Sequence, residues 1–196
     1  DNRREPEKIV GDGADGGTTF TDSSERVGRH TITENGDVAN TRAQKKVGDS
    51  SIYFDGSGDY LSIPESSDWD FGTGDFTIEM WMRRANENDE YSFYINGSSS
   101  NHFRWNTYGA SAMSIHSPNG PDAISINPGP TQDTWTHVAQ VRSGDTITAY
   151  IDGVSGGTSD ATGDSLNTTG VVNIGIGASS GSNDFTSYNI KLFGVK

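Results

Sequence analysis

The stretch that decides the fold is Asp75-Phe76-Thr77-Ile78-Glu79-Met80-Trp81-Met82-Arg83. Every second position is apolar, at Phe76, Ile78, Met80 and Met82. Successive side chains of a β-strand point to opposite faces, so a period of two predicts a strand with one buried face. A helix would need apolar residues spaced by three and four, and this spacing is missing here.

The same pattern recurs on both sides of this stretch. Short apolar or alternating runs predict further strands at 51–54, 60–64, 91–95, 102–105, 113–116, 123–126, 134–142, 146–151, 171–176 and 188–193. One or two short strands are expected between residues 25 and 50. No segment has a convincing amphipathic helix pattern. About a dozen short strands separated by turns predict an all-β fold, a two-sheet antiparallel β-sandwich or jelly roll.

Two turns are predicted in particular. Asp152-Gly153 is the strongest hairpin signal in the chain, because both residues accept the positive φ of a tight turn. The segment Asp55–Asp59 is predicted to join the strands 51–54 and 60–64 as a hairpin. The strand after that turn should end at Pro64, which has no N–H for a sheet ladder.

The chain has 196 residues, of which 31% are hydrophobic and 10% aromatic. The aromatic residues argue against disorder, and 25 glycines supply the turns of a β-protein. A chain of this size buries enough surface to fold without disulfides. We therefore expect one domain over residues 11–196, preceded by a polar arm at 1–10.

The formal net charge of -13 limits the partners. Nucleic-acid binding through phosphates needs a basic surface, so we expect no nucleic-acid partner. No apolar run approaches the roughly 18 residues of a membrane span, so no membrane insertion is expected. The absence of cysteine excludes disulfides, thiolate zinc sites and thiol nucleophiles.

Five segments occur in an order that resembles a known family. They are 11–24, 51–64, 70–81, 135–139 and 150–154. Together they are similar to laminin-G-like domains of the concanavalin A-like lectin/glucanase superfamily, from about residue 11 to residue 193. The resemblance implies a jelly roll of two curved antiparallel sheets, located outside the cell or on a virion surface. The Gly-rich opening resembles domains of tail fibres and other virion structural proteins of bacteriophages.

Catalysis is not expected from the acidic residues. Glycoside hydrolases of this superfamily carry a Glu-x-Asp-x-x-Glu strand, and a retaining mechanism needs two carboxyls about 5 Å apart. That spacing does not occur in the sequence, and Glu79 is the only glutamate of its strand. The sequence therefore predicts a protein that is not an enzyme, with glycoside hydrolysis as the outlying alternative.

Calcium is the predicted cofactor. Its candidate ligands are Asp12, Asp15, Asp55 and Asp59. Calcium takes six to eight oxygens at about 2.3–2.6 Å, and loop carbonyls with one or two carboxylates supply such a set. The alternative is that these aspartates only stabilise turns by accepting local backbone N–H groups. The last segment, 187–193, lacks a carboxylate that related domains often carry there.

A carbohydrate site is predicted in residues 101–108. Aromatic faces stack on sugars, and planar polar groups bind the hydroxyls. The candidate residues are Asn101, His102, Arg104, Trp105, Asn106 and Tyr108. The alternative is a core strand with Phe103 and Trp105 pointing inward and with His102, Arg104 and Asn106 pointing outward.

Two functions follow from these patterns. The first is a non-enzymatic surface or adhesion module of a virion or an extracellular assembly, with a cell-surface glycan as its partner. The second is a structural decoration or fibre protein that contacts neighbouring proteins or further copies of itself. A binding module should expose an aromatic residue beside polar groups, whereas a structural module should use exposed apolar residues at subunit contacts.

Overall fold

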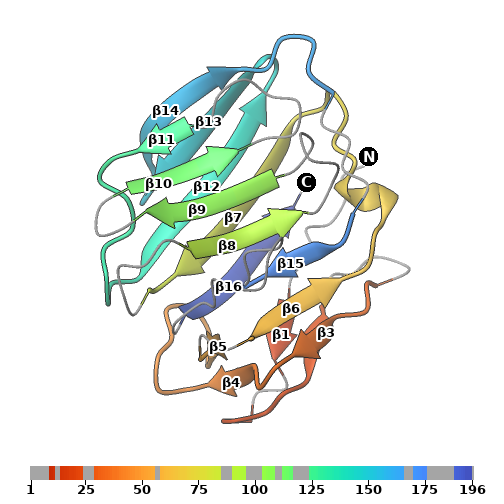
Figure 1. The fold of residues 1–196 in the computed structure, drawn as a ribbon, viewed down its shortest axis with the longest axis vertical. Coiled ribbons are helices and arrows are strands. Elements are labelled where there is room, and N and C mark those ends of the chain that lie inside the picture. The colour runs from red at the N-terminus through yellow and green to blue at the C-terminus, as the bar shows by residue number, and fades with distance from the viewer. Residues whose placement is uncertain are drawn as a thin grey trace.

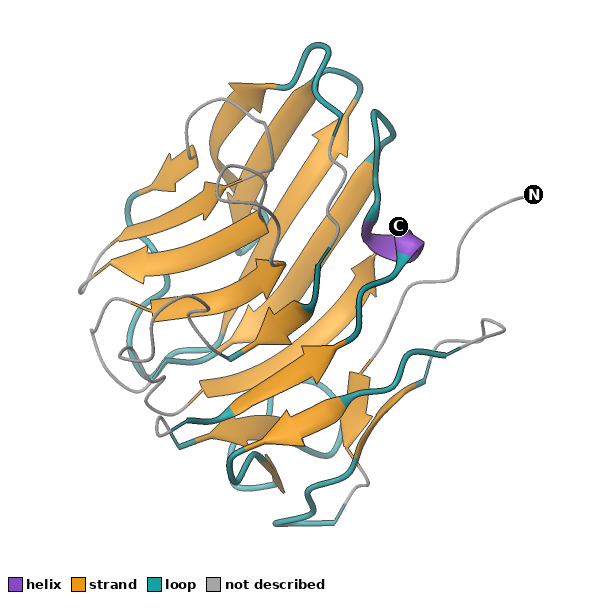
Figure 2. Cartoon of the chain, turned by 45° about the vertical axis from the view of Figure 1, so that its right-hand side comes forward, coloured by secondary structure: helices purple, strands orange, loops and turns teal. Residues whose placement is uncertain are grey.

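A computed structural model describes residues 9–11, 14–23, 29–55, 58–84, 90–95, 103–108, 112–116, 124–165, 170–175 and 188–195. Two seven-stranded antiparallel sheets lie face to face, and Figure 1 shows one in front of the other. The predicted two-sheet antiparallel sandwich is confirmed. The only described helix is the short 3-10 helix η1 (Ser67–Trp69), and strands make up most of the described fold (Figure 2). No described helix has the length and apolar character needed to cross a membrane.

The first sheet contains the strands of the middle of the chain. In spatial order they are β11 (Ile124–Ile126), β10 (Ala112–His116), β9 (Phe103–Tyr108), β8 (Glu90–Ile95), β15 (Val172–Ile174), β6 (Tyr60–Ile63) and β3 (Thr33–Asn35). Neighbouring strands in this order are antiparallel.

The second sheet lies behind the first in Figure 1. In spatial order its strands are β14 (Val154–Asp160), β13 (Thr146–Ile151), β12 (Thr136–Ser143), β7 (Phe76–Met82), β16 (Tyr188–Val195), β5 (Ser51–Phe54) and β4 (Ala39–Thr41). A separate pair joins β1 (Ile9–Gly11) to β2 (Phe20–Asp22). Ile9 is buried in the core. The other residues of the predicted arm, apart from Val10 in β1, lie outside the described residues.

The core fills the space between the sheets. Strand β7 contributes all four of its alternating apolar side chains, Phe76, Ile78, Met80 and Met82, and each is buried. Phe103 of β9 meets the ring of Phe76 edge-on, with centroids 5.6 Å apart, so the two sheets interlock through aromatic contacts. The period of two in the sequence therefore identified the buried face of β7 correctly.

The predicted hairpin of residues 51–54 and 60–64 is wrong. Strand β5 pairs with β4 and β16 in the second sheet, whereas β6 pairs with β3 and β15 in the first. Phe54 and Leu61 are both buried in the core that the two sheets share. The connection between these strands therefore crosses from one sheet to the other, and both strands keep an apolar face inward.

The turn at Asp152-Gly153 has the predicted form. Asp152 has φ 49° and Gly153 has φ 78°, and the two residues join β13 to β14. The Asp152 carboxylate also accepts the backbone N–H of His137 at 2.8 Å. Strand β14 itself was not predicted, because its Gly- and Ser-rich sequence has no alternating apolar pattern.

Candidate functional site

The predicted carbohydrate segment forms strand β9 of the first sheet. Asn101 and His102 lie outside the described residues, and Tyr108 is described only through its backbone at the end of the strand. The remaining candidates are Arg104, Trp105 and Asn106. Because side chains alternate along a strand, Trp105 lies on the opposite face from its two neighbours.

Trp105 is a core residue with no exposed surface. Its indole Nε1–H donates to Gln140 Oε1 of the second sheet at 2.9 Å, and its ring contacts Phe93 at 5.5 Å between centroids. No face of this indole is available to a sugar. The prediction that Trp105 binds carbohydrate is wrong, and the alternative with Phe103 and Trp105 in the core is confirmed.

Arg104 lies on the outer face of the first sheet, which faces away from the core. Across the strands it pairs with Tyr94 of β8, and Tyr94 pairs with Asn173 of β15. Asn106 pairs with Ser114 of β10. These five residues, Tyr94, Arg104, Asn106, Ser114 and Asn173, form a polar tract across four adjacent strands.

The polar tract is unusual in being largely buried. Asn106 and Ser114 are each 4% exposed, and Arg104, which is half-buried, is the most accessible member. The predicted outward direction of Asn106 is correct, but its low exposure means that it does not offer the free surface amide expected from the sequence. The tract contains amide, hydroxyl, phenol and guanidinium groups, which are the groups that hydrogen-bond sugar hydroxyls.

Two of the predicted calcium ligands come together with a third carboxylate. One ligand oxygen from each of Asp37, Asp55 and Asp59 lies within 4.8 Å of the others. Asp37 is not among the predicted ligands, because it is distant in sequence from Asp55 and Asp59 and approaches them only when β3 and β6 pair in the first sheet. Of the other two candidates, Asp15 accepts the backbone N–H of Arg42 at 2.8 Å, and Asp12 lies outside the described residues.

Asp59 is already engaged by the backbone. Its Oδ1 accepts the N–H of Asp37 at 2.7 Å, and its Oδ2 accepts the N–H of Asp55 at 2.8 Å. Burial raises the pKa of the Asp59 carboxyl above its ordinary value of 3.8, and the neighbouring Asp37 also raises it, against the lowering effect of the two N–H groups. This geometry fits a carboxylate that holds the crossover between β5 and β6. One oxygen from each of these three carboxylates would supply three of the six to eight oxygens that calcium takes, so carbonyls, water or second carboxylate oxygens would have to supply the rest.

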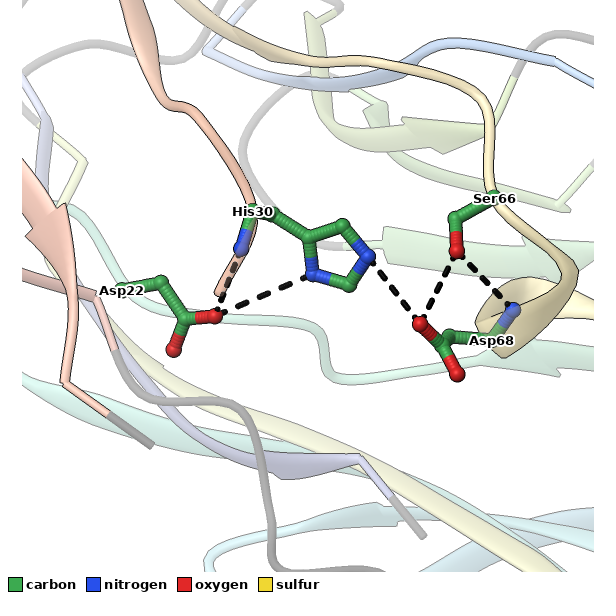
Figure 3. Close-up of polar contacts among 4 residues, drawn as sticks. All are labelled: Asp22, His30, Ser66 and Asp68. Atoms are coloured by element: carbon green, nitrogen blue, oxygen red, sulfur yellow. Dashed lines mark hydrogen bonds and ion pairs between the residues drawn. The ribbon is translucent and has the colours of Figure 1, made fainter. Parts of the chain in front are cut away.

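A second polar cluster surrounds His30 (Figure 3). Its Nε2 lies 3.2 Å from Asp68 Oδ2, its Nδ1 lies 3.8 Å from Asp22 Oδ2, and its backbone N–H donates to the same Asp22 oxygen. Ser66 Oγ donates to Asp68 at 2.9 Å. The hydroxyl therefore contacts the carboxylate and not the imidazole, so these residues do not form a histidine-activated nucleophile. No sequence spacing links the three segments that meet here.

The family model described as the concanavalin A-like lectin/glucanases superfamily, Laminin_G_3, matches residues 55–191. The chain belongs to the concanavalin A-like lectin/glucanase superfamily. This assignment agrees with the fold, because the matched residues include the central strands of both sheets. No curated protein matches the chain.

Several solved structures share this concanavalin A-like fold. The binding domain of Paraclostridial Mosquitocidal Protein 1 has a TM-score of 0.71 and 14% identity, covering 97% of this chain and 48% of that one. The receptor binding domain of botulinum neurotoxin C/D mosaic serotype has a TM-score of 0.68 and 11% identity, covering 98% of this chain and 48% of that one. The botulinum neurotoxin serotype G binding domain has a TM-score of 0.64 and 14% identity, covering 89% of this chain and 45% of that one. The chain spans about half the length of each, and at these identities the likeness is one of fold.

Proposed function

We propose that this domain is a non-enzymatic binding module that attaches a virion or another extracellular assembly to cell-surface glycans. The observation that carries the proposal is the polar tract around Arg104. An ordinary solvent-facing sheet surface has no need of buried amides, because buried polar groups cost free energy unless they are hydrogen-bonded. The half-buried Arg104 is the member of the tract that a ligand can reach, and the buried Asn106 and Asn173 give it polar surroundings that suit the recognition of hydroxyl groups.

The state of the carboxylates supports a binding role over a hydrolytic one. The described cluster of Asp37, Asp55 and Asp59 has its central member only 2% exposed and hydrogen-bonded to two backbone N–H groups. A glycosidase needs an acid and a second carboxylate on either side of an accessible substrate. The similar solved structures, whose titles describe binding domains, are consistent with the same role.

An array of bacterial and host surface polysaccharides tests the proposal, with and without calcium. The wild-type domain should bind at least one polysaccharide, and Arg104→Ala should lower that affinity about tenfold or more, since it removes charge-assisted hydrogen bonds. Arg29→Ala is the control, because it removes the same charge from an exposed position outside the tract. Absence of binding to every polysaccharide, or equal binding by Arg104→Ala, would contradict glycan recognition at the tract.

One observation favours the structural alternative. Val154 is 71% exposed at the start of β14, which is an edge strand of the second sheet. An exposed apolar residue on a strand edge suits contact with a neighbouring subunit of a fibre or a decoration layer. Sedimentation of the wild-type domain and of Val154→Asp tests this role. A concentration-dependent oligomer that Val154→Asp dissociates would support it, and two monomers would oppose it.

Calcium at the cluster of Asp37, Asp55 and Asp59 remains a prediction from Asp55 and Asp59. Calorimetric titration of the domain with calcium chloride tests it directly. Asp37→Asn is the informative variant, because Asp37 is exposed and no described hydrogen bond uses its side chain to hold the backbone. Heat of binding in the wild type that disappears in Asp37→Asn would support the site, and a wild type without heat of binding would exclude it.

A further inference from the structure

An aromatic surface lies on the outer face of the second sheet. Trp81 of β7 is half-buried, and its ring lies 5.2 Å from the ring of His137 on β12, centroid to centroid. His137 Nε2 lies 3.4 Å from Glu79 Oε2 on the same face. Tyr53, on β5 two strands away, is 37% exposed on this face as well. We call Glu79, Trp81, His137, Tyr53 and the nearby Lys46 the Trp81 surface.

Lys46 brings positive charge to this surface. Its ammonium lies 4.6 Å from the centroid of the Trp81 ring, within the range of a cation–π contact. Lys46 belongs to the exposed segment Arg42-Ala43-Gln44-Lys45-Lys46, which follows β4. This segment holds three of the 14 Lys and Arg residues of a chain whose net charge is -13. The segment that places Lys46 over this half-buried indole is therefore rich in cationic side chains.

Within the described part of the chain, some charged side chains in this region have an ion-pair partner and others do not. Arg83, the residue that follows β7, is paired with Asp133 at 2.7 Å, and Glu79 faces His137. Among the described residues, no carboxylate lies within ion-pair distance of the Lys45 or Lys46 ammonium. These two ammonium groups are therefore available to a ligand anion.

We propose that the Trp81 surface binds an acidic saccharide, with a uronic acid as the simplest unit. The apolar face of the sugar ring stacks on the indole, and its carboxylate pairs with Lys46, whose long flexible stem lets the ammonium move to the edge of the ring. Glu79 and His137 are placed to hydrogen-bond the hydroxyls. Tyr53 offers a second aromatic contact on the same face, which suits a ligand of repeating rings.

This inference rests on the proposed glycan-binding function, but it uses the sheet opposite the polar tract. The two sites can therefore be separated by mutation. Arg104→Ala leaves the Trp81 surface intact, and substitutions at Lys45 and Lys46 leave the polar tract intact, because Arg104 lies on the first sheet whereas Lys45 and Lys46 follow β4 of the second.

Oligogalacturonate and its methyl ester are the probes, since they share a sugar ring and differ in the carboxylate charge. Calorimetry should show that the wild type binds the acid at least tenfold more tightly than the ester. Lys45→Ala/Lys46→Ala should lower the affinity for the acid about tenfold, and Trp81→Phe should lower the affinity for both probes. Ser155→Glu/Thr158→Glu is the matched control, because it changes the net charge equally at exposed positions on β14 and should bind like the wild type.

Three results would overturn the inference. They are equal binding of acid and ester, an unchanged affinity in Lys45→Ala/Lys46→Ala, and loss of acid binding in Arg104→Ala, which would move the site to the first sheet. If the wild type binds neutral polysaccharides through Arg104 but does not bind oligogalacturonate, this inference fails while the proposed function stands. If oligogalacturonate binds through Lys46 and Arg104→Ala has no effect on any glycan, the Trp81 surface stands and the polar tract fails.

Discussion

Arg142 illustrates how a charge is accommodated inside this sandwich. Its guanidinium is buried and donates to four backbone carbonyls, those of Gly72, Gly144, Ala161 and Asp164, at 2.8 to 3.2 Å. These carbonyls belong to three separate loops, so one side chain fixes the loops at one end of the molecule. The planar fork of the guanidinium is required, because a lysine has one compact ammonium and cannot reach all four acceptors.

Arg142→Lys should therefore lower the free energy of unfolding by about 3 kcal/mol, as expected when a buried charged network is broken. Urea denaturation followed by tryptophan fluorescence measures the change. Arg29→Lys, at an exposed position, should change stability by less than about 0.5 kcal/mol. A similar small effect of Arg142→Lys would show that the four hydrogen bonds do not hold these loops.

Asp59 makes stability depend on pH in a predictable direction. Its pKa is raised in the folded protein, first by burial, so the folded state keeps this proton at pH values where the unfolded chain has released it. The contribution of Asp59 to stability is therefore largest below pH 3.8 and falls as pH rises toward the raised folded value.

The free energy of unfolding of the wild type minus that of Asp59→Asn should decrease over this pH window, because the variant has no carboxyl to titrate at this position. Groups that do not interact with Asp59 contribute equally to both proteins and cancel. Urea denaturation of both proteins from pH 3.5 to pH 6 is the measurement, in a range where aspartates titrate. A difference that grows with pH would mean that the two backbone N–H groups lower the pKa of Asp59 by more than burial raises it. The folded state would then stabilise the charged carboxylate.

At the level of single elements, β14 depends on a residue without a side chain. A Cβ added at Gly156 would lie 2.5 Å from Ile126 Cγ2 of β11, where the two sheets come together at one edge. Gly156→Ala should lower the free energy of unfolding by about 1–3 kcal/mol, the usual cost of overpacking. Ser155→Ala, next along the strand and exposed, serves as the control in thermal denaturation. Equal melting temperatures for the two variants would contradict this close contact.

The same strand shows what the sequence could and could not predict. The apolar alternation of β7 specified its buried face, and each of the eleven runs predicted as strands overlaps an observed strand. Strand β14 was missed because close packing there selects glycine, which leaves no apolar pattern to read. The β5–β6 hairpin was wrong because alternation shows which residues are buried but does not show which sheet a strand joins.

Prediction of the candidate sites was limited in the same way, because a local pattern does not show which distant segments meet. Strand parity placed Arg104 on the outer face and left Trp105 as either a sugar platform or a core residue, and only packing against Gln140 decided between them. Asp37 and His30 were not identified, because their partners come from segments far apart in the chain. Local pattern therefore predicted the faces of strands, whereas sites built across strands required the tertiary structure.

At the scale of the whole molecule, the charge of -13 should make stability rise with salt. Carboxylates on a compact fold repel one another, and the Debye length falls from about 30 Å at 0.01 M to about 10 Å at 0.1 M. The melting temperature should therefore increase between these sodium chloride concentrations, and potassium chloride should act equally, because screening depends on charge and not on the ion. A lower melting temperature at 0.1 M would mean that salt weakens stabilising ion pairs such as Arg83–Asp133 by more than it weakens the net repulsion between carboxylates.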